Sequence, residues 1–218
     1  MSYYHHLIKT APALNPKWSG IQAYYKLDNT ALDSVNTNDL TLVNGTTYAT
    51  GKVNNGLTFD GVNDYVSLPT FLFDFTGDFT INMWINLAFL GNMGLWQNNT
   101  ASNFCWMNFT GERIRWVGAS DATIMYSTTY MSINTWYMVT ITRKASTRTR
   151  MYINGVLEAN DTATTNSASN TANRRLGSYY NAYYLNGKMD EVSFFNVEKT
   201  ASDITAIYNA GSPTQYPL

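Results

Sequence analysis

One stretch of thirteen residues constrains the fold of this chain more than any other feature of its sequence. Residues 56–68 read Gly-Leu-Thr-Phe-Asp-Gly-Val-Asn-Asp-Tyr-Val-Ser-Leu. The order predicts a strand that ends in a tight turn at Asp60-Gly61, a second polar turn at Asn63-Asp64, and a short β-branched strand. We expect Gly61 to adopt a positive φ angle, which a branched side chain tolerates poorly. The stretch therefore favours a β-rich fold.

Short strand-like runs separated by turn signals continue along most of the chain. Residues 78–86 alternate strictly between two faces, which is the period of a strand. The residues that share one face are Phe79, Ile81, Met83 and Ile85. Asn154-Gly155 lies between two apolar runs and predicts a type I′ hairpin turn. Strands at this spacing indicate an all-β sandwich.

We expect one domain over residues 21–218, preceded by an irregular arm over residues 1–20. Pro12 and Pro16 interrupt regular structure in the arm. We expect the arm to contact a partner, such as a capsid or tail protein, and its deletion to leave thermal stability almost unchanged. One short helix is predicted near the C-terminus, where Thr200 and Asp203 form a capping pattern and Gly211 follows an apolar stripe.

Several motifs in order carry a family resemblance. Residues 136–143, 151–157 and 185–192 follow the Phe-Asp-Gly stretch, and residues 24–28 precede it. Together they resemble the laminin G-like branch of the concanavalin A-like jelly rolls, from Ile21 to Gly211. The resemblance implies an antiparallel two-sheet jelly-roll sandwich, and a non-catalytic module for adhesion or display that binds glycans or proteins.

Composition excludes some classes of partner. The formal net charge is −1 and only 13% of residues are charged, whereas nucleic-acid-binding proteins usually carry a basic excess. No apolar run approaches the roughly 18 residues of a membrane span. The first residues lack the basic and apolar regions of a signal peptide. The single Cys105 excludes an internal disulfide, so we expect synthesis in a host cytoplasm.

The pattern of titratable residues argues against an enzyme. The only two histidines, His5 and His6, lie in the predicted arm. The chain also lacks the Glu-x-Asp-x-x-Glu strand of laminarinase-type hydrolases and the Gln-x-His strand of jelly-roll alginate lyases. The four glutamates are not spaced as a catalytic pair on one strand. We therefore expect no catalytic residues and no required cofactor.

A structural calcium ion is one interpretation of the aspartates. Asp28, Asp33 and Asp190 fall where domains of the resembled family often hold calcium, and carboxylate oxygens are its usual ligands. The alternative is that Asp28 and Asp33 form turns while Asp190 pairs with Lys188 or caps a loop.

Aromatic residues in turn-like stretches are the candidate ligand-binding site. Sugars stack their C–H faces on aromatic rings, and polar side chains bind their hydroxyls. The predicted binding residues are Trp96, Asn98, Tyr179, Tyr180, Tyr183 and Tyr184. The alternative is that half of these rings belong to the core. A second hypothesis is a basic edge for an anionic glycan, formed by Arg143, Lys144, Arg148, Arg150, Arg174 and Arg175. The alternative, which we favour, is that these residues form a solvated hairpin tip.

Two biological settings fit these features. The first is a phage virion surface protein, a decoration or fibre-associated subunit, displayed in many copies or as an oligomer. The chain has its own Met1 and no exporting signal, which favours this setting. The alternative is a carbohydrate-binding accessory module of a secreted bacterial protein, with an extracellular location.

Overall fold

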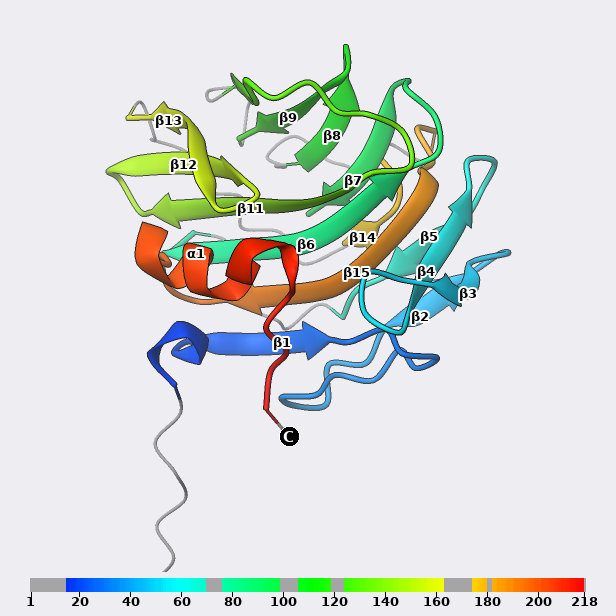
Figure 1. Cartoon of the computed structure of the whole chain (residues 1–218), viewed down its shortest axis with the longest axis horizontal. Helices are drawn as coiled ribbons and strands as arrows, with labels where there is room; N and C mark the ends of the chain where they lie inside the picture. Colours follow the sequence, from blue (N-terminus) through cyan, green and yellow to red (C-terminus); the bar gives the residue numbers. More distant parts are fainter. Residues whose placement is uncertain are drawn as a thin grey trace, which may run out of the picture.

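The structure is a computed structural model that describes residues 15–69, 76–98, 106–118, 124–162, 174–179 and 182–217. In these ranges the chain forms a sandwich of two antiparallel sheets with one short α-helix on its outer side (Figure 1). The predicted jelly-roll sandwich is confirmed. No helix in the described residues is long and apolar enough to cross a membrane.

Sheet A is the larger of the two sheets. Its strands are β1 (Ile21–Tyr25), β3 (Thr47–Thr50), β4 (Asn55–Asp60), β6 (Phe79–Leu87), β11 (Trp136–Lys144), β12 (Arg148–Ile153), β13 (Val156–Asp161) and β15 (Asn186–Phe195). They are ordered β13-β12-β11-β6-β15-β4-β3, and β1 also pairs with β15.

Sheet B packs against sheet A. Its strands are β2 (Thr41–Val43), β5 (Tyr65–Ser67), β7 (Met93–Gln97), β8 (Trp106–Thr110), β9 (Arg113–Val117), β10 (Ile124–Tyr126) and β14 (Arg175–Leu176). They are ordered β10-β9-β8-β7-β14-β5-β2. The main core fills the space between the two sheets, and the predicted inward face of β6 is buried in it.

The opposite face of sheet A is also buried, by a second core. The helix α1 (Ala201–Tyr208) lies across this face in Figure 1, and its Ile204 and Ile207 are buried there with Trp84 of β6. Thr200 and Asp203 form the predicted capping box. The helix ends with Asn209 in a left-handed conformation, and the short helix η3 (Asn209–Gly211) follows.

The predicted boundary at residue 21 is wrong, because Trp18 belongs to the second core. This residue ends the short helix η1 (Pro16–Trp18), and it is only 1% exposed. Its ring contacts those of Tyr24 and Tyr216, each at a centroid distance of 5.5 Å, and stacks on Phe195 at 6.2 Å. Pro16 starts a helical turn here, since proline is favoured at the first helical position. Residues 1–14 lie outside the described residues.

Both predicted tight turns are present. Asn154 and Gly155 have φ angles of 50° and 79°, as the type I′ turn between β12 and β13 requires. Gly61 has a φ of 80°, and a Cβ atom there would lie 2.8 Å from the Cβ of Asn186. The Asp60-Gly61 turn thus lies directly against the start of β15.

Strand β15 changes partner halfway along its length. Its first half pairs with β4 and its second half with β1. The register shifts between Asp190 and Ser193, and Glu191 in that bulge has a positive φ of 51°. The bulge places two adjacent acidic residues inside the protein, where both are buried.

Candidate functional site

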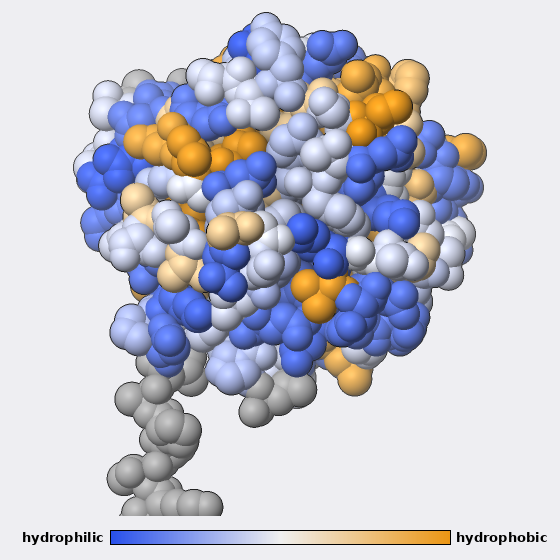
Figure 2. Space-filling view, in the orientation of Figure 1, coloured by the Kyte–Doolittle hydropathy of each residue, from blue (hydrophilic) through white to orange (hydrophobic). Residues whose placement is uncertain are grey.

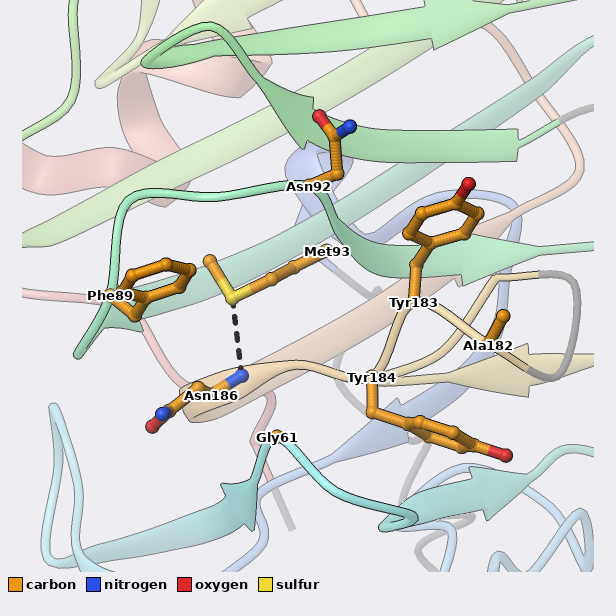
Figure 3. Close-up of a pocket in the computed structure, with 8 residues that line it drawn as sticks. All are labelled: Gly61, Phe89, Asn92, Met93, Ala182, Tyr183, Tyr184 and Asn186. Atoms are coloured by element: carbon orange, nitrogen blue, oxygen red, sulfur yellow. Dashed lines mark hydrogen bonds between the residues drawn. The ribbon is translucent and has the colours of Figure 1, made fainter.

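A hollow of about 360 Å³ lies where three loops meet: the β4–β5 turn, the β6–β7 loop and the segment before β15 (Figure 3). It is lined by Gly61, Phe89, Asn92, Met93, Ala182, Tyr183, Tyr184 and Asn186. None of these lining residues carries a charge. The hollow therefore presents aromatic rings together with amide and hydroxyl groups.

A second hollow of about 150 Å³ adjoins the first. Its lining residues are Asn92, Thr110, Arg115, Tyr179 and Tyr183. The two hollows share Asn92 and Tyr183, so they form one surface feature with Tyr183 between its two parts. We call the two hollows together the Tyr183 groove.

The tyrosine rings of the groove are held in a fixed arrangement. Tyr183 is 43% exposed and stacks on Tyr179 at a centroid distance of 5.4 Å and an interplanar angle of 25°. Figure 3 shows the rings of Tyr183 and Tyr184 on opposite sides of the segment that carries them, with Phe89 across the hollow. An exposed ring backed by a second ring is a rigid platform for an apolar ligand face.

The backbone fixes the segment that carries these rings. The carbonyl oxygen of Tyr179 accepts hydrogen bonds from the N–H groups of Ala182 (3.2 Å) and Tyr183 (3.0 Å). The N–H of Gly94 donates to the carbonyl of Tyr183 at 2.7 Å. A Cβ atom on Gly94 would lie 2.2 Å from the carbonyl carbon of Ser178. Only glycine therefore lets β7 approach this segment so closely.

The structure brings three of the predicted binding residues together. Tyr179, Tyr183 and Tyr184 all line the Tyr183 groove. Tyr180 lies outside the described residues. Ligand binding by the three tyrosines stays a prediction.

The placement of Trp96 and Asn98 in an exposed site is wrong. Both are fully buried. Trp96 stacks on Trp116 in the main core at a centroid distance of 5.7 Å and an interplanar angle of 9°. The side-chain oxygen of Asn98 accepts a hydrogen bond from Arg174 Nε at 2.9 Å. Neither side chain can reach an external ligand, because both are enclosed by the protein. The interior of the sandwich favours a ring such as Trp96, since its burial removes a large apolar area from water.

Phe89 and Asn92 form the other wall of the groove, and neither was predicted from the sequence. The available signal was an apolar pair followed by Gly91-Asn92, directly after the alternating strand. Phe89 is 57% exposed. A Cβ atom on Gly91 would lie 2.2 Å from the Phe89 ring, so the missing side chain makes room for that ring.

The six residues of the predicted basic edge do not form one positive surface. Four belong to β11 or β12 in sheet A and one to β14 in sheet B. Arg143 and Arg174 are buried. Lys144 and Arg148 form ion pairs, with N–O distances of 2.6 Å and 2.8 Å respectively. The basic-edge hypothesis is therefore wrong for this surface.

Asp190, one of the predicted calcium ligands, holds a loop. Its Oδ2 accepts hydrogen bonds from two backbone amides of the β3–β4 turn, Lys52 (2.8 Å) and Val53 (2.9 Å), and its Oδ1 accepts one from Glu191 (2.9 Å). Lys188 donates to the carbonyl of Thr50 and not to Asp190. Burial raises the pKa of the Asp190 carboxyl to about 7, although the three amides oppose that shift.

The other two predicted ligands also accept hydrogen bonds from the protein. Asp28 accepts one from the amide of Asn55 at 3.0 Å, in the same turn that Asp190 holds. Asp33 accepts amide hydrogen bonds from Tyr24 (3.0 Å) and Val35 (2.9 Å). Among the described residues, no three of His, Cys, Asp or Glu are grouped so that they could hold a metal ion. Calcium binding stays a prediction.

Glu191 joins the C-terminal segment to the bulge of β15. Gln215 Nε2 donates to its Oε1 at 2.7 Å, and the Tyr24 hydroxyl donates to its Oε2. Burial raises the pKa of the Glu191 carboxyl to about 7, opposed by the hydrogen bond from Gln215. Asp190 and Glu191 are thus two adjacent buried acids, and their burial was not predicted from the sequence.

Comparison with known proteins agrees with this architecture. A family model described as the concanavalin A-like lectin/glucanases superfamily matches residues 60–205. No curated protein sequence matches the chain.

Several solved structures share this fold. Domain 4 of AbnA, an extracellular arabinanase from Geobacillus stearothermophilus solved in complex with arabinotriose, has a TM-score of 0.70 and 17% identity. The similarity covers 86% of this chain and 98% of that domain. The binding domain of Paraclostridial Mosquitocidal Protein 1 has a TM-score of 0.76 and 16% identity, with 89% of this chain and 53% of that chain covered.

The receptor binding domain of botulinum neurotoxin C/D mosaic serotype has a TM-score of 0.71 and 14% identity, with 88% of this chain and 51% of that chain covered. This chain therefore spans about half the length of the two toxin binding domains. At these identities the similarity establishes the fold that the three structures share with this chain.

Proposed function

Because the chain belongs to the concanavalin A-like lectin/glucanase superfamily, we propose that it is a non-catalytic module that binds a glycan in the Tyr183 groove. The observation that carries this proposal is the exposed, stacked ring of Tyr183 between two hollows lined by polar and aromatic groups. The similarity to an arabinanase domain that was solved with arabinotriose supports a glycan as the ligand.

The groove offers the two kinds of contact that a sugar needs. The face of the Tyr183 ring supports the C–H side of a sugar ring, while Asn92 and the side chain of Asn186 present amide donors and acceptors beside it. Phe89 limits the first hollow on its other side. One stacked ring contributes about 1 kcal/mol, so a single groove binds weakly.

The roles of the carboxylates support the absence of catalysis. The described lining of the groove contains no Asp, Glu or His. Glu158 accepts hydrogen bonds from the amides of Thr128 and Thr129, and Glu198 pairs with Arg148. Glu191 is buried in its own network. A glycosidase needs two carboxyl groups facing one bond, and these residues serve structural contacts instead.

We place this module on a surface that displays many copies, such as a phage virion. Weak individual sites become useful when many act together, because each later binding event is intramolecular. The same reasoning applies to the alternative setting, an accessory module of a secreted bacterial protein. In both settings the partner is a glycan on a cell or particle surface.

A glycan array with the purified chain tests the proposal, first as the free protein and then coupled in many copies to a particle. We expect binding only to a small set of glycans, with a large gain on the particle. Tyr183→Ala should abolish this binding, whereas Tyr183→Phe, which keeps the ring, should retain most of it.

The matched control is Leu157→Ala, which removes another exposed apolar side chain, on β13. Binding that survives Tyr183→Ala, or that falls equally with Leu157→Ala, would exclude the groove as the site. Hydrolysis of any bound glycan would contradict the non-catalytic assignment.

A further inference from the structure

The outer face of β9 carries two arginines that lead away from the Tyr183 groove. Ile114 and Trp116 of this strand are buried in the main core. Because side chains alternate along a strand, Arg113 and Arg115 point to the opposite face. Both are partly exposed.

Two tyrosines lie beside these arginines. The register pairs Tyr126 of β10 with Arg115, and the Arg115 guanidinium lies 6.0 Å from the Tyr126 ring centroid. The Arg113 guanidinium lies 5.0 Å from the same ring and 5.5 Å from the ring of Tyr130. Tyr126 and Tyr130 are both exposed. We call Arg113, Arg115, Tyr126 and Tyr130 the β9 stripe.

The stripe is continuous with the groove. Arg115 lines the second hollow together with Tyr179 and Tyr183, whereas the first hollow has only uncharged lining residues. Glu112 precedes Arg113 in the β8–β9 turn, so it lies at the end of the stripe away from Arg115. A ligand that crosses Tyr183 therefore passes from a neutral hollow to a positive one.

We propose that the ligand of the groove is an acidic glycan. One neutral sugar unit occupies the first hollow, and a carboxylate or sulfate group on the next unit accepts hydrogen bonds from the Arg115 guanidinium in the second. Arginine suits this role because its planar fork matches planar and tetrahedral anions. Further units follow the β9 stripe over Tyr126. This inference rests on the proposed glycan-binding function and specifies its ligand class.

The test compares oligosaccharides of one backbone in neutral, carboxylated and sulfated forms. We expect at least one acidic form to bind the intact chain about tenfold more tightly than the neutral form, the scale of one charged hydrogen bond. Raising the ionic strength should reduce that preference. Arg115→Gln should remove this preference, so that the acidic and neutral forms bind equally, and Arg115→Lys should restore part of it.

The matched control is Arg150→Gln, which removes the same charge from β12 in sheet A, where Arg150 donates to Asn160. Circular dichroism checks that each variant is folded. The inference is wrong if neutral and acidic forms bind equally, or if Arg150→Gln acts like Arg115→Gln. In those cases neutral binding that depends on Tyr183 would still uphold the proposed function. If no form binds, the proposed function itself fails.

Discussion

Replacing Trp18 by alanine should strongly destabilise the protein, although sequence alone assigned this residue to a dispensable arm. The side chain is 1% exposed and contacts three other rings at 5.5–6.2 Å. Truncating a buried tryptophan costs about 3–5 kcal/mol, since both the transfer energy and a residual cavity contribute. For a chain of this length that loss lowers Tm by about 6–20 °C.

The measurement is urea unfolding of the full chain followed by fluorescence and circular dichroism, with a thermal scan in parallel. Leu32→Ala is the control, because Leu32 is 59% exposed and its loss should change little. Trp18→Ala combined with Tyr216→Ala should be less destabilising than the sum of the two single changes, because the two rings touch. A loss below about 1 kcal/mol for Trp18→Ala would refute the inclusion of this residue in the second core.

Further predictions concern the turn, the groove, the buried acids and calcium. Gly61→Val should lower the unfolding free energy by about 1–3 kcal/mol, since φ is positive and the new Cβ meets Asn186; an unchanged urea midpoint would contradict this. Gly94→Ala should displace the segment at Tyr183 and abolish glycan binding; full binding by a folded variant would contradict the close approach. The pKa values of Asp190 and Glu191 are raised to about 7 in the folded state, so both acids bind more protons there than in the unfolded chain. The stabilising contribution of the two carboxyl groups is therefore fully present below about pH 4 and is lost as pH rises through about 7. The urea concentration at the unfolding midpoint should accordingly decrease as pH rises from about 5 to about 8. Glu191→Gln should flatten that slope, and an unchanged slope would exclude Glu191 as its source. For calcium, binding by the predicted aspartates should appear as a Tm that rises with added calcium and falls with a chelator; an unchanged Tm would exclude a structural ion.

The sequence predicted the parts of the fold that depend on local geometry. The alternation in residues 78–86 places Ile81 and Met83 in the main core, and the turns at Gly61 and Gly155 have the expected positive φ angles. These features depend on backbone sterics and on the period of a strand, which a single segment displays by itself.

The sequence did not separate core rings from surface rings. Trp96 and Tyr183 both occur in short polar contexts, yet one is buried against Trp116 and the other is exposed in the groove. The difference depends on which strand packs opposite each ring, and that pairing joins residues far apart in the chain. For the same reason the burial of Glu191 could not be predicted from the sequence, because it depends on contacts with Tyr24 and the C-terminal segment.

The contact between Trp18 and Tyr216 has a consequence for how the module can be joined to other proteins. The two rings lie 5.5 Å apart although they come from opposite ends of the described chain. A short linker between these segments would therefore permit a circular permutant, with new ends opened in an exposed loop. Equally, the domain could be inserted into a loop of a host protein through two adjacent attachment points, since chain ends that lie close together tolerate such insertion.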